Sequence, residues 1–277
     1  MAQTIQSPQD LLQKPQESRL IKQMRSIKKK IMIMSGKGGV GKSTVAANLA
    51  ARLADRGYKV GLLDADIHGP SIPKMFGIED QRPGVDENGI VPIQVTENLS
   101  VMSIALLVED RDSPIIWRGP AKMGAIKQFL QEVSWGKLDY LFIDLPPGTG
   151  DEPLSIAQLI EKLDGAVVVT TPQDVALLSV RKSLTFASML KVPVIGIVEN
   201  MSGMKCPHCN EKIDIYGTGG VEKAAADFNV PVLGELPIDP AVATMEDNGR
   251  VHLEGDSDLE WFREFNRIVD SVENFKQ

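Results

Sequence analysis

The residues between positions 36 and 43 combine the types that a phosphate-binding loop needs. Gly36, Gly41, Lys42 and Ser43 are spaced as in the P-loop pattern G-x-x-x-x-G-K-[ST]. Glycines let backbone N–H groups approach a phosphate because no Cβ intrudes, and the start of the following helix adds free N–H groups. Lysine supplies a mobile cation, and serine supplies a hydroxyl for Mg²⁺. The sequence therefore predicts a nucleotide site formed by Gly36, Lys37, Gly38, Gly39, Val40, Gly41, Lys42, Ser43 and Thr44.

Three aspartates follow apolar runs that are typical of buried strands. Asp64 and Asp66 come after the run YKVGLL, and Asp144 ends the run YLFID. The carboxyl ends of parallel strands meet at the edge of the sheet that also carries a P-loop. Carboxylates there can hold Mg²⁺ and orient an attacking water, although a single aspartate after a strand is commonly a helix cap or turn residue. We assign Asp144 and Asp64, with Ser43, to Mg²⁺, and Asp66 to positioning of the water.

Lys37 is an additional lysine inside the same loop. The backbone of the loop already encloses its own nucleotide's phosphates, so this lysine cannot easily reach them. It could reach the nucleotide of a facing subunit, as a cation supplied in trans; the alternative is a solvated surface lysine. The segment GKGGVGKST resembles the deviant P-loop of the ParA/MinD superfamily, and that resemblance implies a homodimer whose interface this lysine crosses when ATP binds. Lys37, Lys42 and Asp66 are thus the expected catalytic residues.

The residues that select the base are harder to identify from spacing than those that bind phosphate. The Asn-Lys-x-Asp signature of many GTPases is absent. Asn200 follows the run VIGIVE, and its amide suits the donor–acceptor edge of adenine, although a turn residue is equally expected there. Pro237 and Asp239 follow the run VLGEL and could line the same pocket. These three residues are the candidates for contacts with adenine.

Cys206 and Cys209 are the only cysteines of the chain. As a dithiol they could form a redox motif in which a helix N-terminus activates one thiolate. As metal ligands they supply half of a four-ligand site for zinc or an iron–sulfur cluster. A four-cysteine site then needs a second subunit, which a two-fold axis near this loop would bring. The following segment NEKIDIYG is typical of a loop or strand, which disfavours the redox interpretation, and His208 is expected to be a spacer.

Five further motifs resemble the Mrp/ApbC family of cytosolic iron–sulfur carrier ATPases, which are related to the eukaryotic nucleotide-binding scaffold proteins. The resemblance covers residues 29–269 and rests on DADIHGPS, WRGP, DLPPGTGDE, TTPQDVAL and ENMSGMKCPHC. It implies that Cys206 and Cys209 of two chains bridge one [4Fe–4S] cluster, which is delivered to apoproteins while ATP modulates the process. The N-terminal segment has no cysteine and is short, so we expect neither the additional ferredoxin-like cluster of the eukaryotic relatives nor the small extra domain of many bacterial members.

We therefore expect an ATP-dependent iron–sulfur carrier. Hydrolysis should be slow because no residue is an obvious arginine finger in cis; Arg118 is the nearest candidate. The alternative from another class is a ParA/MinD-like positioning or partition ATPase, which would need a basic patch for DNA or a basic amphipathic terminal helix for a membrane. The last helix has an apolar stripe, but its other positions mix acidic and basic residues, a pattern more typical of core packing. A CxxC thiol oxidoreductase, the third alternative, predicts activity independent of nucleotide.

Composition limits the remaining classes. The 277 residues are 43% hydrophobic and 24% charged, which predicts a folded protein. No apolar run approaches the roughly 20 residues that cross a bilayer, and the first residues lack the apolar core of a secretory signal, so we expect a cytoplasmic location. The formal net charge is −7, and the one basic cluster lies at the expected entry to the sheet. We expect no nucleic-acid partner and no membrane partner.

The elements that must position these residues alternate along the chain. Buried-type strands are expected at 31–34, 58–63, 99–104, 140–144, 166–170, 194–198 and 232–236. Helices are expected from the P-loop to residue 56 and at 118–133, 175–190, 221–228 and 258–275. Strands separated by helices of this length indicate βαβ units. We predict one doubly wound α/β domain of P-loop NTPase type over 28–277, with a mostly parallel sheet and helices on both faces.

Two segments are expected to lie outside this regular alternation. Residues 1–27, rich in Gln, Ser, Lys and Pro, are predicted to form a mobile tail with a short helix around 18–26. Residues 67–95, rich in Pro and Gly, are predicted to form a long excursion rather than a packed element.

Overall fold

The computed structural model describes residues 20–21, 23–66, 69–107, 119–160, 162–206, 208–217, 220–251 and 259–276. Most of the expected tail, and Arg118, lie outside these residues. Leu20 and Met24, in the described end of the tail, are both buried in a hydrophobic core of the domain. This end of the tail therefore packs against the domain. The spacing of four between Leu20 and Met24 places both side chains on one face of a helical turn.

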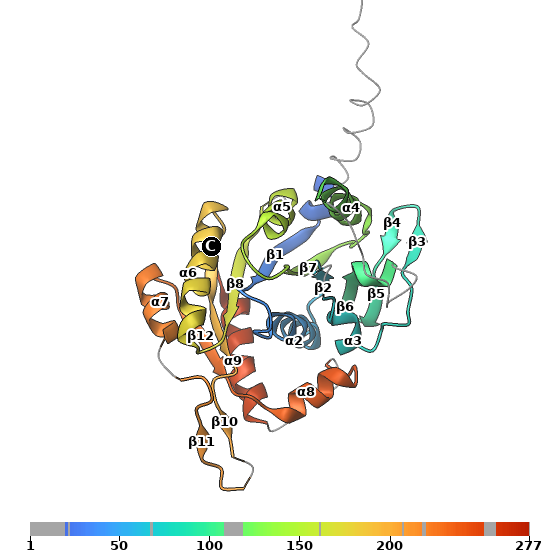
Figure 1. Cartoon of the computed structure of the whole chain (residues 1–277). Helices are drawn as coiled ribbons and strands as arrows, with labels where there is room; N and C mark the ends of the chain where they lie inside the picture. The colour runs from blue at the N-terminus through green and yellow to red at the C-terminus, as the bar shows by residue number, and fades with distance from the viewer. Residues whose placement is uncertain are drawn as a thin grey trace, which may run out of the picture.

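A central sheet runs through the molecule in the order β12-β9-β8-β1-β7-β2-β6-β5 (Figure 1). Neighbouring strands are parallel throughout, except that β5 is antiparallel to β6 at one edge. This order confirms the predicted doubly wound, mostly parallel architecture. The strands are β1 Ile27–Met34, β2 Val60–Asp64, β5 Ile93–Thr96, β6 Leu99–Ser103, β7 Leu138–Asp144, β8 Gly165–Thr170, β9 Val194–Asn200 and β12 Val232–Leu236.

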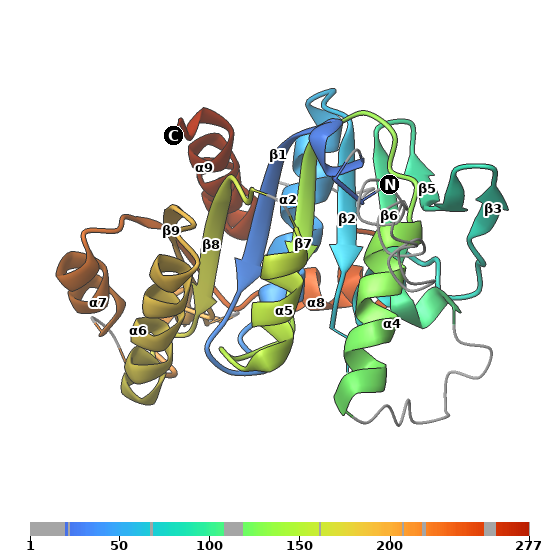
Figure 2. The ribbon, with the colours of Figure 1, turned by 90° about the horizontal axis from the view of Figure 1, so that it is seen from above.

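Helices cover both faces of the sheet (Figure 2). One face carries α2 Lys42–Asp55, α3 Ile72–Met75, α8 Pro240–Asp247 and α9 Glu260–Asn274. The other carries α4 Gly119–Glu132, α5 Asp151–Leu159, α6 Asp174–Met189 and α7 Gly220–Phe228. A 3₁₀ turn, η1 Ile104–Leu107, follows β6. Because both faces are covered, the inner strands are apolar on both sides, which explains their continuous hydrophobic runs.

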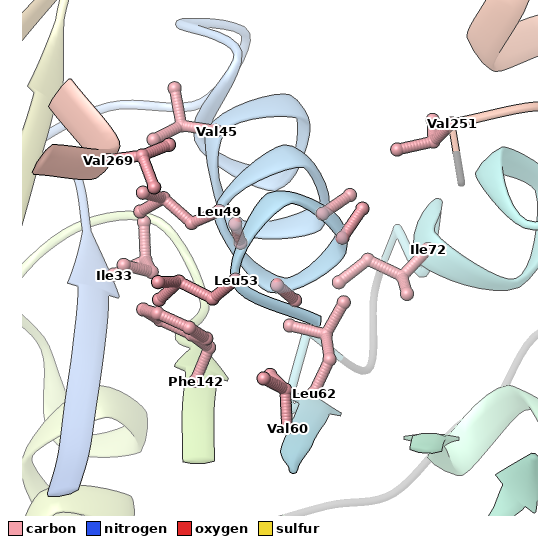
Figure 3. Packing of buried hydrophobic residues seen from close by; sticks show 14 of the residues in the cluster. Ile33, Val45, Leu49, Leu53, Val60, Leu62, Ile72, Phe142, Val251 and Val269 are labelled. Atoms are coloured by element: carbon pink, nitrogen blue, oxygen red, sulfur yellow. The ribbon is translucent and has the colours of Figure 1, made fainter. Parts of the chain in front are cut away.

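The core on the face of the sheet that carries α2, α3, α8 and α9 is organised around α2 (Figure 3). Val45, Leu49 and Leu53 recur every four residues along this helix and are fully buried, so they form one apolar stripe. The stripe faces Ile33 of β1 and Phe142 of β7, which are also fully buried. The helix that begins at the P-loop is therefore held firmly against the two central strands.

Four short elements and two longer helices differ from the sequence expectation. The expected excursion at 67–95 contains α3, the hairpin of β3 Gly84–Asp86 and β4 Gly89–Val91, and the edge strand β5. The prediction of an unpacked segment is therefore wrong there. Elements of three or four residues are too short to show a periodicity in the sequence, which is why the prediction missed them. Helices α5 and α8 were not predicted; α8 begins with Pro240 after the cap residue Asp239, a start signal that is visible in the sequence.

The terminal helix α9 uses its apolar stripe for packing. Trp261 stacks on Phe265, with ring centroids 4.7 Å apart, and both are buried. The whole stripe is buried: Trp261, Phe262, Phe265, Ile268, Val269 and Val272. The expectation of core packing is confirmed, and this stripe is not a free surface that could bind a membrane. None of the described helices is both long enough and apolar enough to span a bilayer.

Phe265→Ala is expected to lower the free energy of unfolding by about 3–5 kcal/mol, because it leaves a cavity where the ring is now 0% exposed. Urea unfolding followed by circular dichroism measures this loss. Val85→Ala is the control, since Val85 is 79% exposed and its truncation should change stability by less than about 0.5 kcal/mol. Equal losses in the two variants would contradict the packing described for α9.

Candidate nucleotide site and cysteine hairpin

The predicted P-loop connects β1 to α2, and its glycines are required by conformation and by close packing. Gly39 and Gly41 have φ values of 75° and 80°, in the left-handed region that other residues adopt at a cost. A Cβ on Gly36 would lie 2.3 Å from the carbonyl oxygen of Ser179 on α6. A Cβ on Gly41 would lie 2.0 Å from Nδ2 of Asn200. The loop is therefore packed against α6 and against the end of β9.

A cavity of about 250 Å³ opens at this loop. Its lining joins P-loop residues, including Lys42 and Ser43, to Asp66 and Pro147 from the ends of neighbouring strands. Backbone N–H groups at the start of α2 add the positive end of its dipole. The cavity thus combines the donors and the cation that bind a polyphosphate.

Asp144, at the carboxyl end of β7, is bound by the first turn of α2. Lys42 Nζ donates to its Oδ1 at 2.6 Å, and Ser43 Oγ donates to its Oδ2 at 2.5 Å. Burial raises the pKa of Asp144, while Lys42 and Ser43 oppose that shift. Lys42, Ser43 and Asp144, three of the side chains predicted for phosphate and Mg²⁺, therefore meet at one point.

Asp64 lies beside Asp144, since the two are register partners on β2 and β7. Ser103 Oγ donates to Asp64 Oδ2 at 3.0 Å, and the backbone N–H of Asp66 donates to Oδ1 at 3.1 Å. Burial, and then the charge of Asp144, raise the pKa of Asp64 to about 8. Two buried carboxylates side by side repel each other, and a divalent cation with oxygen ligands relieves that repulsion. The residues present therefore fit Mg²⁺.

Lys37 points to α6. Its Nζ donates to Oε1 of Gln173 at 2.7 Å, and its carbonyl oxygen accepts from Ser35 Oγ at 2.9 Å. Gln173 precedes α6 by one residue and is 136 positions away along the chain. No local pattern in the sequence connects these two residues, so sequence reasoning did not find Gln173.

Of the three base candidates, Asn200 contacts the P-loop directly. Its Nδ2 donates to the carbonyl oxygen of Val40 at 3.0 Å, so it braces the loop from the end of β9. Asp239 is the N-cap of α8 and accepts from the backbone N–H of Ala241 at 2.9 Å. Pro237 lines another cavity, of about 480 Å³, beside the cysteine hairpin. The structure thus joins Asn200 to the P-loop, whereas Pro237 lines the cavity near the cysteines.

Glu246 of α8 is a further acidic residue at the P-loop. Thr44 Oγ1 donates to its Oε2 at 3.1 Å, and burial raises the pKa of Glu246 to about 7. The two residues are 202 positions apart in the chain, and Glu246 lies on a helix that was not predicted. This contact could not be inferred without the fold.

The cysteine pair lies at the tip of a hairpin formed by β10 Met204–Lys205 and β11 Lys212–Ile213. This hairpin projects away from the central sheet (Figure 1). Across the tip, the Cys206 N–H donates to the Glu211 carbonyl at 2.9 Å. Cys206 is half-exposed and Cys209 is exposed, and both are free thiols. The tip therefore presents two thiols to the surroundings of the protein.

Backbone N–H groups of Cys209 and His208, and then the Cys209 thiol, lower the pKa of the Cys206 thiol. These donors belong to a turn, and not to the helix N-terminus that the dithiol redox interpretation requires. Over the described parts of the chain, no group of three or more His, Cys, Asp and Glu side chains could hold a metal ion. Among the described residues of one chain, the two thiols therefore belong to no group of three such side chains.

Several known proteins are similar to this chain in sequence and in structure. The family model described as NUBPL iron-transfer P-loop NTPase, of the ParA group, matches residues 26–273. An iron-sulfur cluster carrier protein from Methanocaldococcus jannaschii is 52% identical over 264 residues, which are 95% of this chain and 91% of that relative. A cytosolic Fe-S cluster assembly factor NUBP2 homolog from Dictyostelium discoideum is 49% identical over 230 residues, 82% of this chain and 87% of the relative. The solved nucleotide-binding protein from Archaeoglobus fulgidus, in complex with ADP, matches with a TM-score of 0.77 and 41% identity, covering 90% of this chain and 96% of that one.

Gly36→Ala is expected to lower the free energy of unfolding by about 1–3 kcal/mol, because the new Cβ overlaps the backbone of α6. Gly38→Ala, two residues along the same loop, is the matched control: its Cβ would meet only Pro147, at 4.0 Å. Thermal unfolding of both variants without nucleotide separates packing from ligand binding. If Gly36→Ala is as stable as Gly38→Ala, the close approach of the P-loop to α6 is refuted.

Proposed function

Because the chain belongs to the family of NUBPL iron-transfer P-loop NTPases, we propose that it is an ATP-dependent carrier of iron–sulfur clusters. Two copies hold one [4Fe–4S] cluster between their cysteine pairs, pass it to apoproteins in the cytosol, and hydrolyse ATP slowly. One observation carries this proposal: a protruding two-thiol tip belongs to the same domain as a complete P-loop. The names of the similar carrier and assembly proteins support the same function.

In the proposed nucleotide site, the P-loop backbone and Lys42 bind the phosphates of ATP. Ser43, Asp144 and Asp64 supply the oxygens that would hold Mg²⁺, and the bound ion would neutralise charge on the phosphates. Lys42 and Ser43 already contact Asp144, so these groups are preorganised where the phosphates would bind. Asp66, which lines the cavity, is proposed to orient the attacking water.

Adenine is proposed to lie near Asn200, Pro237 and Asp239. One N–H of the Asn200 amide donates a hydrogen bond to the carbonyl oxygen of Val40, and its second N–H and its carbonyl oxygen match the acceptor and donor of adenine's edge. Through its contact with Val40, Asn200 would connect base recognition to the shape of the P-loop.

The second copy has two roles in this proposal. Lys37 would act in trans on the ATP of the facing copy, which supplies the positive charge that a cis arginine finger supplies in other NTPases. The partner's hairpin would complete four thiolate ligands for the cluster. The family extent, 26–273, supports our treating residues 28–277 as one P-loop NTPase domain with a cluster-binding loop.

Anaerobic reconstitution with iron and sulfide is expected to give the thiolate-to-iron absorbance of a cluster, with about four irons per two chains. Cys206→Ala and Cys209→Ala should each abolish the cluster and leave ATP affinity within about twofold, since neither side chain belongs to the P-loop cavity. His208→Ala is the matched control at the same tip and should keep the cluster. Recovery of zinc alone, with no cluster that can be transferred to an apoprotein, would remove the proposed function.

Lys42→Ala should weaken ATP binding by roughly tenfold to a hundredfold, because it removes a charged contact to phosphate.

Lys37→Ala should leave ATP affinity nearly unchanged but lower hydrolysis by at least about tenfold, since this lysine serves the facing copy. Lys223→Ala, at an exposed position of α7, controls for the change of charge. Calorimetry and phosphate release measure the two effects, and an equal loss of ATP affinity in Lys37→Ala would contradict action in trans.

A further inference from the structure

Gln173 directly precedes α6, at the position where a side chain usually caps the helix. Its backbone is extended, but its side chain makes no capping hydrogen bond. Instead, its amide oxygen accepts a hydrogen bond from Lys37 Nζ at 2.7 Å. Glutamine is not among the preferred capping residues. The side chain at this position therefore serves the P-loop lysine and not the helix.

Both partners of this contact are held on a stiff framework. The Lys37 carbonyl accepts from Ser35 Oγ, and Gly36 packs so closely on Ser179 of α6 that no Cβ fits between them. The P-loop and the start of α6 therefore cannot separate without a loss of packing. A movement of the Lys37 side chain leaves this packing intact, and the hydrogen bond to Gln173 holds its ammonium in place.

The surface around this contact is open to a second molecule. Lys37 and Gln173 are half-buried, and Gly38 and Gly39, next to Lys37 in the loop, are exposed. On α6, Leu178 is 63% exposed, five residues beyond Gln173. The ammonium of Lys37 thus rests at the rim of the loop, and it meets a neutral amide oxygen where a charged acceptor would bind it more strongly.

We propose that Gln173 is a positioning residue that tethers Lys37 to α6 in the single chain, and that the phosphates of a facing copy's ATP displace it. The inference rests on the proposed function, in which Lys37 acts in trans. A neutral acceptor suits this task, because it holds the lysine at the loop and releases it to a triphosphate with several negative charges. The tether therefore sets how readily two copies associate on ATP.

Two substitutions at this position should act in opposite directions. Gln173→Glu replaces the neutral acceptor by a carboxylate, which pairs with Lys37 more strongly and competes with the facing phosphates. Gln173→Ala removes the acceptor and frees the lysine. The measurement is the chain concentration at which ATP hydrolysis per chain is half-maximal. We expect Gln173→Glu to raise it by about fivefold and Gln173→Ala to lower it by a similar factor.

Gln81→Glu is the matched control, because it makes the same change of charge at an exposed glutamine outside the site; it should leave the half-maximal concentration unchanged. A second readout follows the tether itself. The nucleotide-free protein is labelled with ¹⁵N-lysine, and the Lys37 Nζ resonance is assigned by its loss in Lys37→Arg. The protons on Lys37 Nζ should exchange slowly with solvent in the parent chain and rapidly in Gln173→Ala. A merely structural role for Gln173 would not change this exchange.

The outcomes separate the tether from the function on which it rests. Suppose that hydrolysis needs Lys37. The tether is then overturned if the parent chain and both Gln173 variants have equal half-maximal concentrations. A lower rate in both variants, which is the result expected if Gln173 only stabilises the loop, would also overturn it. If Lys37→Ala hydrolyses ATP normally, the trans role fails, and the exchange of the Lys37 resonance alone then decides whether the tether exists.

Discussion

The ion pair between Lys42 and Asp144 is the contact on which the nucleotide site depends. Asp144 is fully buried at the end of β7, and both of its carboxylate oxygens accept from the first turn of α2. A buried carboxylate that loses its partner typically costs about 3–5 kcal/mol. The strand end and the helix start are therefore bound to each other, and this contact restrains the P-loop between β1 and α2. The core beneath α2, through Leu49 and Leu53, holds the same helix from its other side.

A second contact connects this rigid loop to the cysteines. Asn200, the last residue of β9, donates to the carbonyl of Val40, and the hairpin begins at Met204, four residues further on. The root of the hairpin is anchored, because the Ser202 N–H donates to the Leu236 carbonyl and Lys205 forms an ion pair with Glu260 at 2.5 Å. A shift of the P-loop on nucleotide binding would therefore reach the hairpin through one short strand end. This is a physical route by which ATP could act on a cluster held at the tip.

What the sequence predicts well is what local pattern encodes. The apolar runs of β1, β7 and β8 need both faces buried, and the glycines of the P-loop are a fixed motif, so the parallel sheet and the loop could be inferred. The edge strand β5 and hairpin β3–β4 could not, because strands of three or four residues carry no period. The partners of Lys37, Thr44 and Asn200 lie 136, 202 and 160 positions away. Such contacts depend on the order of strands in the sheet, as does the raised pKa of Asp64 beside Asp144.

On the proposed function, each chain is incomplete at two separate places, and one symmetry operation completes both. Two cysteines supply half of a four-thiolate cage, and Lys37 serves a phosphate of the other chain. A two-fold interface that satisfies both sets of contacts gains from each, since the second contact forms at high effective concentration once the first exists. By linkage, a cluster that strengthens the pair of chains must also strengthen ATP binding across it, and departure of the cluster must weaken it by the same factor. Coupling between cargo and nucleotide then needs no special relay, because it follows from the sharing of one interface by two half-sites.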